Sequence, residues 1–140
     1  MKKDRYNFNH KTIVLDAIAK HYIESDLYEV EIIYFNKCPE SKKNYKGKAV
    51  NIYKYLGGRI LGRFDICNYE YICDTEMERK NAKYNFFIMT CIGADTVGEV
   101  LPKKLMRDDK GLLVDRKGLN TFEEIIRECD LFLNALKPTE

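Results

Sequence analysis

The amino-acid sequence predicts a two-layer α+β domain, in which an N-terminal and a C-terminal helix pack on one face of a four-stranded antiparallel meander. Three observations lead to this fold class: a helical period near each end, four strand-like segments between them, and connections among those strands that hold no helix. Residues 1–140 are expected to form a single domain. A chain with 45% hydrophobic and 33% charged residues is typical of a globular protein.

The first helix is predicted over residues 9–25, "NHKTIVLDAIAKHYIES", with Asn9 as its N-cap. Apolar residues recur there at helical spacing and form one stripe, made of Val14, Ile18 and Tyr22 with Ile13 and Ala17 alongside. This stripe is the surface that the helix must bury on the sheet.

Four strands are predicted to follow. The first, "LYEVEIIYF" at 27–35, alternates apolar and acidic residues, which indicates a half-buried strand. A polar connection at 36–48 leads to a hairpin that turns at Gly57-Gly58 and whose second arm continues to residue 73. A charged loop follows at 74–83. The next segment, "YNFFIMTCI" at 84–92, has apolar residues on both faces of a strand and is predicted to be the most buried strand.

The remainder of the chain is predicted to be mostly helical. Thr96 and Glu99 have capping-box spacing and predict a short helix over 96–106 that Pro102 interrupts. Residues 108–118 read as a turn with a short strand at 112–114. Asn120-Thr121 caps the last helix, which ends at Pro138 and has Glu123 and Glu124 in box position. Its apolar stripe comprises Phe122, Ile125, Ile126, Cys129, Phe132, Leu133 and Leu136.

The hairpin can close in two ways. A two-residue Gly57-Gly58 turn pairs Leu56 with Arg59 and leaves both faces mixed. A three-residue loop pairs Leu56 with Ile60 instead and brings six apolar residues to one face: Val50, Ile52, Leu56, Ile60, Phe64 and Ile66. Lys54 is the polar exception on that face. Burying each such aliphatic side chain is worth about 1.5–3 kcal/mol, so the second register is preferred.

The preferred register places a partner-binding site on the opposite face of the sheet. That face collects Asn51, Leu61, Asp65 and Cys67 together with the candidate site residues Tyr53, Tyr55, Arg63, Tyr69 and Tyr71. Tyr and Arg are enriched in the energetic centres of protein interfaces, and aromatic sheet faces also stack the bases of single-stranded RNA. The alternative is that the first helix or the short helix at 96–106 covers the tyrosines and makes them core.

The charge distribution favours a protein partner over nucleic acid. Residues 37–63 hold eight basic residues against one acid, but both flanking regions are net acidic, whereas a nucleic-acid binder is expected to be basic as a domain. The basic loop supplies the candidate contacts to an acidic partner or to nucleic acid, namely Lys42, Lys43, Lys46 and Lys48. The aromatic face would also allow a homodimer.

The sequence therefore predicts a small, non-catalytic binding protein that masks or recruits a macromolecular partner, of the inhibitor or immunity type. The alternative function is single-stranded nucleic-acid binding through the aromatic face. A more distant alternative is a metal-dependent nuclease, based on an E-R-K motif at 78–80 and on the nearby acids Asp65, Glu70, Asp74, Glu76 and Glu78.

Other classes have little support in the sequence. The five cysteines lack the close pairing of structural zinc sites, the two histidines are eleven residues apart in one helix, and no cofactor or metal is expected. Because no apolar run is long enough to cross a membrane, and the cysteines do not suggest a disulfide framework, a cytoplasmic location is expected. A Lys-, Asn-, Ile- and Tyr-rich chain without Trp hints at an AT-rich bacterial or phage genome.

Overall fold

The computed structural model describes residues 8–37, 44–69, 77, 80–93, 96–98, 106–107 and 113–138. Within these ranges, the helices α2 (Phe8–Ile23) and α4 (Phe122–Ala135) accompany a main sheet with the strand order β1-β2-β3-β4-β7-β6. These strands are β1 (Tyr28–Lys37), β2 (Asn44–Leu56), β3 (Arg59–Asn68), β4 (Phe86–Ile92), β6 (Met106–Arg107) and β7 (Leu113–Leu119). A second, two-stranded sheet pairs β5 (Thr96–Gly98) with β8 (Leu136–Pro138).

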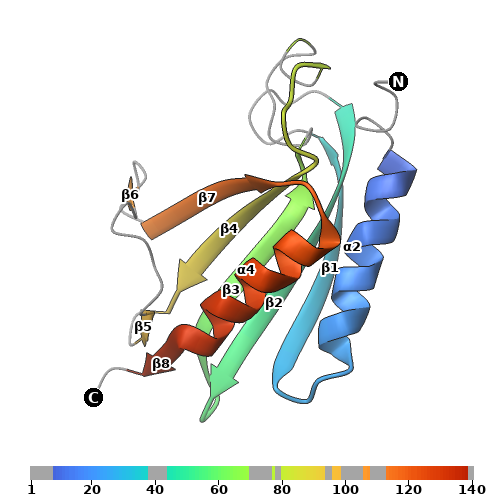
Figure 1. Cartoon of the computed structure of the whole chain (residues 1–140). Helices are drawn as coiled ribbons and strands as arrows, with labels where there is room; N and C mark the ends of the chain where they lie inside the picture. The colour runs from blue at the N-terminus through green and yellow to red at the C-terminus, as the bar shows by residue number, and fades with distance from the viewer. Residues whose placement is uncertain are drawn as a thin grey trace.

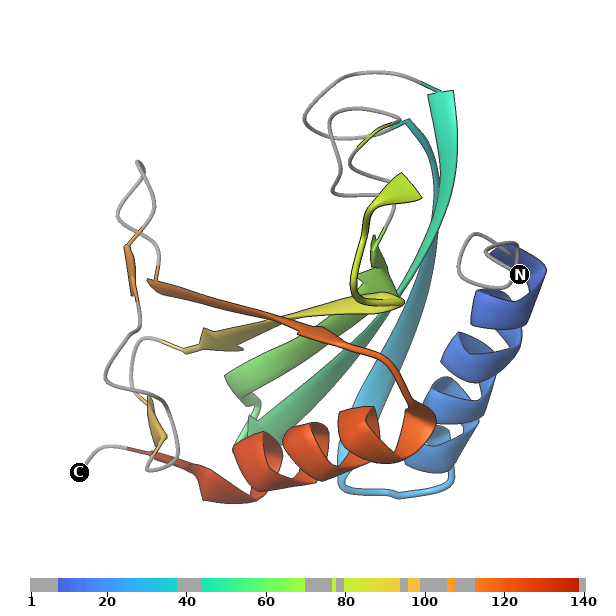
Figure 2. The same ribbon diagram turned by 45° about the horizontal axis from the view of Figure 1, so that its top comes forward.

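The structure confirms a two-layer α+β arrangement with both described helices on one face of an antiparallel sheet (Figures 1 and 2). Strands β1 to β4 form the predicted meander, but the prediction that the sheet has four strands was wrong, because β7 and β6 extend it beyond β4. Residues 113–119, predicted to be mostly turn, form β7 and pair with β4 from Phe86↔Leu119 to Thr90↔Asp115. Strand β7 contains Asp, Arg and Lys, and its amino-acid composition therefore did not indicate a strand. Its backbone pairing with β4 defines it instead.

The predicted short helix over 96–106 was also wrong at both of its ends. Residues 96–98 are strand β5, and 106–107 belong to β6. Strand β5 pairs with β8, from Thr96↔Pro138 to Gly98↔Leu136, so α4 ends at Ala135 and the chain continues as a strand. The capping-box spacing of Thr96 and Glu99 therefore arose without a helix, because long-range pairing with the C-terminal segment outweighed a local preference.

Helix α2 buries the predicted stripe of Val14, Ile18 and Tyr22, but the residues on either side of that stripe differ from the expected ones. Leu15, Ile18, Ala19 and Tyr22 are buried, whereas Ile13, assigned to the stripe, is 67% exposed. Residues 13–15 and 17–19 are all apolar, so the sequence leaves the rotation of the helix ambiguous and its fit to the sheet decides it. Ile18 and Tyr22 were predicted correctly.

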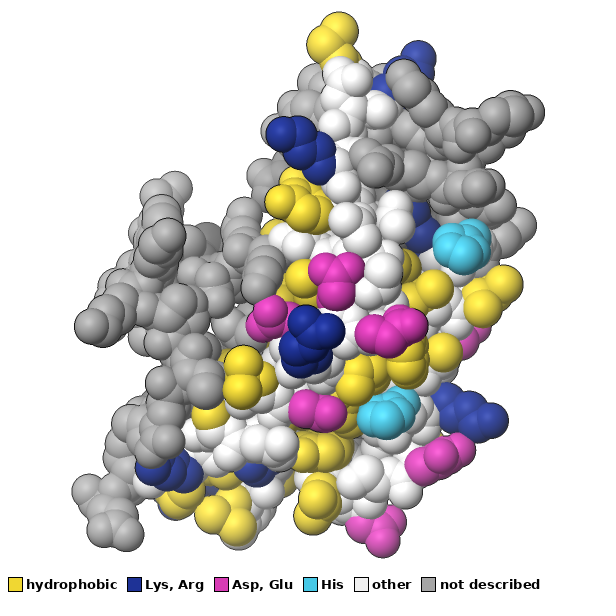
Figure 3. All heavy atoms as spheres, in the orientation of Figure 1, with side chains coloured by type: hydrophobic (Ala, Val, Ile, Leu, Met, Phe, Trp, Pro, Cys, Tyr) yellow, Lys and Arg dark blue, Asp and Glu magenta, His cyan; other side chains and the backbone are white. Residues whose placement is uncertain are grey.

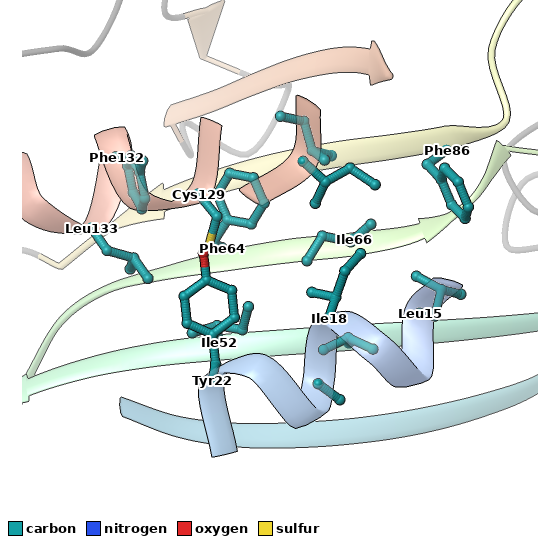
Figure 4. Packing of buried hydrophobic residues seen from close by; sticks show 14 of the residues in the cluster. Leu15, Ile18, Tyr22, Ile52, Phe64, Ile66, Phe86, Cys129, Phe132 and Leu133 are labelled. Atoms are coloured by element: carbon teal, nitrogen blue, oxygen red, sulfur yellow. The ribbon is translucent and has the colours of Figure 1, made fainter. Parts of the chain in front are cut away.

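The core lies between the two helices and the central strands (Figure 4). Leu15 and Ile18 from α2 and Phe132 and Leu133 from α4 pack with Ile52, Phe64 and Ile66 of the sheet. Val50, Ile52, Phe64 and Ile66, four of the six residues assigned to the aliphatic face, are fully buried. Leu56 and Ile60, the other two, are exposed, which corrects that part of the expectation.

A shift of register explains why Leu56 and Ile60 leave the core. The turn itself is the two-residue one, with Leu56↔Arg59 and Tyr55↔Ile60 paired and positive φ at Gly57 and Gly58. Beyond it the pairing changes to Lys54↔Gly62, so that Leu61 is an extra residue of β3. From there on, Ile52↔Phe64 and Val50↔Ile66 follow the register that burial favours.

Polar contacts fix the helix layer to the sheet and the two helices to each other. The Tyr22 hydroxyl of α2 donates to Asp130 Oδ1 of α4 at 2.7 Å. The Lys54 ammonium, the polar exception on the core face, donates to the carbonyl oxygens of Leu133 at 2.6 Å and Leu136 at 3.3 Å. The last turn of α4 has no basic residue of its own, so Lys54 supplies the positive charge that a helix C-terminus favours. At the other end of α4, Thr121 is the predicted N-cap: its Oγ1 accepts from the Glu124 backbone N–H at 3.2 Å, and its hydroxyl donates to Glu124 Oε1 at 3.0 Å.

Truncating the centre of this core should destabilise the fold. We expect Phe64→Ala to lower the free energy of unfolding by about 3–5 kcal/mol, because the ring is fully buried and leaves a cavity between sheet and helices. Chemical denaturation checks this value. The control, Ile13→Ala, removes an exposed side chain and should change stability by no more than about 0.5 kcal/mol; equal effects of the two substitutions would contradict the packing described.

Candidate functional site: the tyrosine face of the sheet

The face of the main sheet opposite the helices carries a cluster of aromatic and charged side chains, here called the tyrosine face. Strand alternation turns Ile52 and Phe64 toward the helices, so their neighbours point to the other side. The register aligns Glu29 of β1, Tyr53 of β2 and Arg63 of β3 across the sheet. Glu31, two residues along β1, lies opposite Asn51 and diagonally next to Tyr53. The tyrosine face comprises Glu29, Glu31, Tyr53, Tyr55, Arg63 and Asp65.

Tyr53 is the centre of this cluster. Its hydroxyl donates to Glu31 Oε1 at 3.0 Å, and its ring stacks on Tyr55 with centroids 6.1 Å apart and planes inclined by 27°. The Arg63 guanidinium lies 5.9 Å from the centroid of the Tyr53 ring, within the range of a cation–π contact. Burial and the hydrogen bond to Glu31 raise the pKa of the Tyr53 phenol, so both favour its neutral form.

Tyr55 is held in a similar way but is more exposed. A hydrogen bond with Glu29 and then burial raise the pKa of its phenol. Its side chain is 39% exposed, although it stacks on Tyr53. Tyr53 and Tyr55 are therefore each oriented by a glutamate of β1, and each turns one ring face to the other.

The charge of Arg63 is balanced within the face by the carboxylate of Asp65. Its Nε donates to Asp65 Oδ2 at 3.0 Å and lies 2.8 Å from Asp65 Oδ1, while Nη2 reaches Cys91 Sγ at 3.5 Å. Burial raises the pKa of Asp65, and the charge of Arg63 partly offsets that effect. Burial likewise raises the pKa of the Cys91 thiol, which disfavours the nucleophilic thiolate.

The charge balance of the face is acidic. Among the side chains that the structure describes, Glu29, Glu31 and Asp65 bring three carboxylates against the single guanidinium of Arg63. The surface that carries the helices has a different charge pattern, because acidic and basic side chains are interspersed there with scattered apolar ones (Figure 3). The tyrosine face thus combines stacked aromatic rings with an uncompensated acidic border along β1.

The tyrosine face is open at only one end. Tyr53, Tyr55 and Arg63 are partly exposed, whereas Ala49, Asn51 and Cys67, farther along the same strands, are buried. Tyr69 lies beyond that buried part, where its ring contacts Tyr84 at a centroid distance of 5.9 Å. Tyr84 packs on β7, because a Cβ added at Gly118 would lie 2.3 Å from Tyr84 Cγ.

Several predicted site residues are therefore separated from the cluster. Of the five residues predicted for the partner site, the structure brings Tyr53, Tyr55 and Arg63 together and places Tyr69 at the far end. Tyr71 lies outside the described residues. Leu61, expected on this face, is instead buried in the core cluster, since the extra residue in β3 changes its surroundings.

The basic residues predicted as contacts are only partly described. Lys42 and Lys43 lie outside the described residues, and the side chain of Lys46 does too. The expectation that Lys48 contributes to an exposed basic surface was wrong, because its side chain is buried. Its ammonium forms an ion pair with Asp16 of α2 and lies 5.0 Å from the centroid of the Tyr34 ring.

The glutamates of β1 were not predicted as part of the site. Their signal in the sequence was the alternation of Glu29 and Glu31 with apolar residues, which gives both acids to the outer face of the first strand. This alternation does not determine which residues of the adjacent strand lie opposite the two glutamates. The β1–β2 register does so, and it sets Glu29 opposite Tyr53 and Glu31 opposite Asn51.

Within the described segments, no group of three His, Cys, Asp or Glu side chains is arranged to hold a metal ion. The acids proposed for a nuclease are mostly outside those segments, and Asp65, which lies inside them, is paired with Arg63.

Neither described helix has the length and apolar character needed to cross a bilayer. Comparisons with protein-family models, with curated proteins and with solved structures find no match.

The hydrogen bond from Tyr53 to Glu31 predicts a measurable shift. In Glu31→Gln the pKa of Tyr53 should fall toward the ordinary value of about 10, because an anionic acceptor that favours the neutral phenol is lost. A raised folded-state pKa contributes stability that is complete below the ordinary pKa and is lost as the pH rises through the folded value. NMR titration of labelled tyrosine rings measures this pKa; Glu123→Gln, on the outer side of α4, is the control and should leave it unchanged.

The Lys48–Asp16 ion pair predicts an asymmetry between two substitutions. Asp16→Asn should destabilise the fold by about 1–3 kcal/mol, because it leaves a buried ammonium without its carboxylate. Lys48→Met should cost much less, since Met fills the space with an apolar chain and Asp16, 56% exposed, remains solvated. Urea denaturation of both variants provides the comparison, and an equal cost would contradict a buried, structurally paired Lys48.

Proposed function

We propose that this chain is a small, non-catalytic binding protein, of the inhibitor or immunity type, that masks or recruits a protein partner through its tyrosine face. The observation that carries the proposal is the partly exposed, stacked Tyr53–Tyr55 pair beside Arg63, on the side of the sheet away from both described helices. Tyrosine and arginine are the side chains that most often dominate the binding energy of protein interfaces.

The geometry supports binding with little loss of side-chain freedom. The two rings are fixed by each other, and Tyr53 is fixed further by Glu31 and by the Arg63 guanidinium. Ordering a flexible side chain at an interface costs about 0.5–1.5 kcal/mol, so rings that are already ordered retain more of their burial energy on binding. A site of this kind suits recognition of a preformed surface.

The acidic border supports a protein partner over single-stranded nucleic acid. A stacking site for nucleic acid requires cations beside the rings to hold the phosphates. Here Glu29 and Glu31 contact the hydroxyls of Tyr55 and Tyr53, and Arg63, the one described cation of the face, is paired with Asp65. Phosphates that follow bases stacked on Tyr53 or Tyr55 would meet carboxylates, which repel them.

The first experiment locates the binding surface. A photoreactive phenylalanine analogue is placed at Tyr55, or at Leu131 on the outer side of α4 as the matched control, and irradiated in cells of the source organism. We expect a specific protein adduct from position 55 alone, because Tyr55 lies in the proposed site and Leu131, 53% exposed, does not. Equal adducts from both positions, or a nucleic-acid adduct from position 55, would contradict the proposal.

Affinity for the purified adduct partner provides the second measurement. Tyr55→Ala should weaken binding by at least about tenfold while changing stability by little, because a partly exposed side chain leaves no large cavity. Leu131→Ala should change neither quantity appreciably. Calorimetric titration together with thermal unfolding separates the two effects, and an unfolded Tyr55→Ala would mean that the ring belongs to the core.

A further inference from the structure

Strand β1 forms an outer edge of the main sheet, beside α2 (Figures 1 and 2). It spans Tyr28–Lys37 and pairs on one side with β2; no other described strand pairs with it. The backbone N–H and C=O groups of such an edge are a template for a further strand. Ile32 is 40% exposed and Tyr34 68% exposed along this strand.

The two sides of this edge strand have different chemistry. On the helix side, Ile32 and Tyr34 lie in register with Val50 and Lys48 of β2. On the tyrosine face, Glu29 and Glu31 lie in register with Tyr53 and Asn51. Since directly opposed side chains on adjacent strands stand about 5 Å apart, an added strand would meet apolar groups on one side and carboxylates on the other.

This pattern selects against a second copy of the same strand. Two antiparallel copies of β1 in one continuous sheet would bring two pairs of glutamates onto the same face within a few residues of each other. Like charges opposite or near one another on adjacent strands are destabilising, and charged residues commonly protect natural sheet edges from self-pairing. A strand with the opposite charge on that face would be stabilised by the same glutamates.

From this edge we infer that β1 accepts an extended segment of the protein partner, in which Lys or Arg alternates with apolar residues. The basic residues would pair with Glu29 and Glu31, and the apolar ones would cover Ile32 and Tyr34, while the backbones extend the sheet by one strand. This inference rests on the proposed function and specifies the partner's chemistry, because the added strand would lie beside the Tyr53–Tyr55 pair and continue the same surface.

A synthetic peptide of defined sequence tests the inference in place of the natural partner. A short, end-capped peptide of alternating Lys and Val is titrated into the labelled full chain, and the backbone amide signals of residues 28–36 are followed by NMR. We expect saturable shifts in these signals. A Glu-Val peptide of equal length, and a Lys-Val peptide with methylated backbone nitrogens at alternate residues, should not produce them, because the first has the wrong charge and the second lacks donors for strand pairing.

A charge exchange makes the test specific to the edge. Glu29→Lys should weaken the binding of the Lys-Val peptide by at least about tenfold and improve binding of the Glu-Val peptide. Glu24→Lys, which places the same change at the exposed end of α2, should alter neither. Binding that is unaffected by Glu29→Lys, or retained by the methylated peptide, would overturn the inference, and so would a concentration-dependent dimer in sedimentation that the Lys-Val peptide cannot dissociate.

The result is separable from the proposed function. Tyr55→Ala should leave the affinity for the Lys-Val peptide nearly unchanged, because the peptide is too small to require the stacked rings. If position 55 cross-links a protein but no peptide pairs with β1, the proposed function stands and the strand-addition mode is wrong. If the peptide pairs with β1 but Tyr55→Ala leaves affinity for the natural partner intact, the edge is a binding site and the tyrosine face is not.

Discussion

The structure depends on the register change at Leu61. A two-residue glycine turn closes the hairpin in a tight form, but continuing its register would mix apolar and polar residues on both faces. The extra residue in β3 restores the pairing of Ile52 with Phe64 and so gives the helices a continuous apolar surface. The same shift sets Tyr53 opposite Arg63 on the other side. Core and candidate site are therefore consequences of one local irregularity, whose cost is offset by burial along the remaining strand.

Part of the basic character of the middle of the chain has a structural role. Lys54 contacts carbonyl oxygens at the end of α4, Lys48 pairs with Asp16 of α2, and Arg63 pairs with Asp65. These three residues come from the segment whose charge suggested an acidic partner. Each is engaged inside the fold, so a count of charges along the sequence overstates the positive charge that a partner would meet. In the folded chain, Lys48 and Lys54 connect the sheet to the two described helices and do not add positive charge to an exposed surface.

The features that sequence could predict are those fixed by local chemistry or by one dominant burial term. Thr121 and Glu124 cap α4 as expected because the motif is complete within one turn, and the Ile52–Phe64 register follows from the apolar residues it buries. The rotation of α2, strand β7 and the role of Lys48 were not predictable in this way. Each is set by a partner remote in sequence: the sheet under α2, the free edge of β4, and Asp16. The candidate site shows the same division, because Tyr53 and Arg63 follow from register within one hairpin, whereas Glu31 reaches Tyr53 only through pairing with another strand.

Glu31 joins the tyrosine face and the edge of β1 into one surface. Its carboxylate accepts hydrogen bonds from Tyr53 and Asn51 of β2, yet the residue belongs to β1, whose outer backbone edge has no described strand beside it. Its backbone belongs to that edge, and its side chain orients a ring of the tyrosine face. A strand added to β1 would restrict β1 and thereby hold Glu31, and through it Tyr53, more firmly in place. A partner that binds both surfaces would then gain more than the sum of two separate contacts, because the first contact reduces the ordering cost of the second.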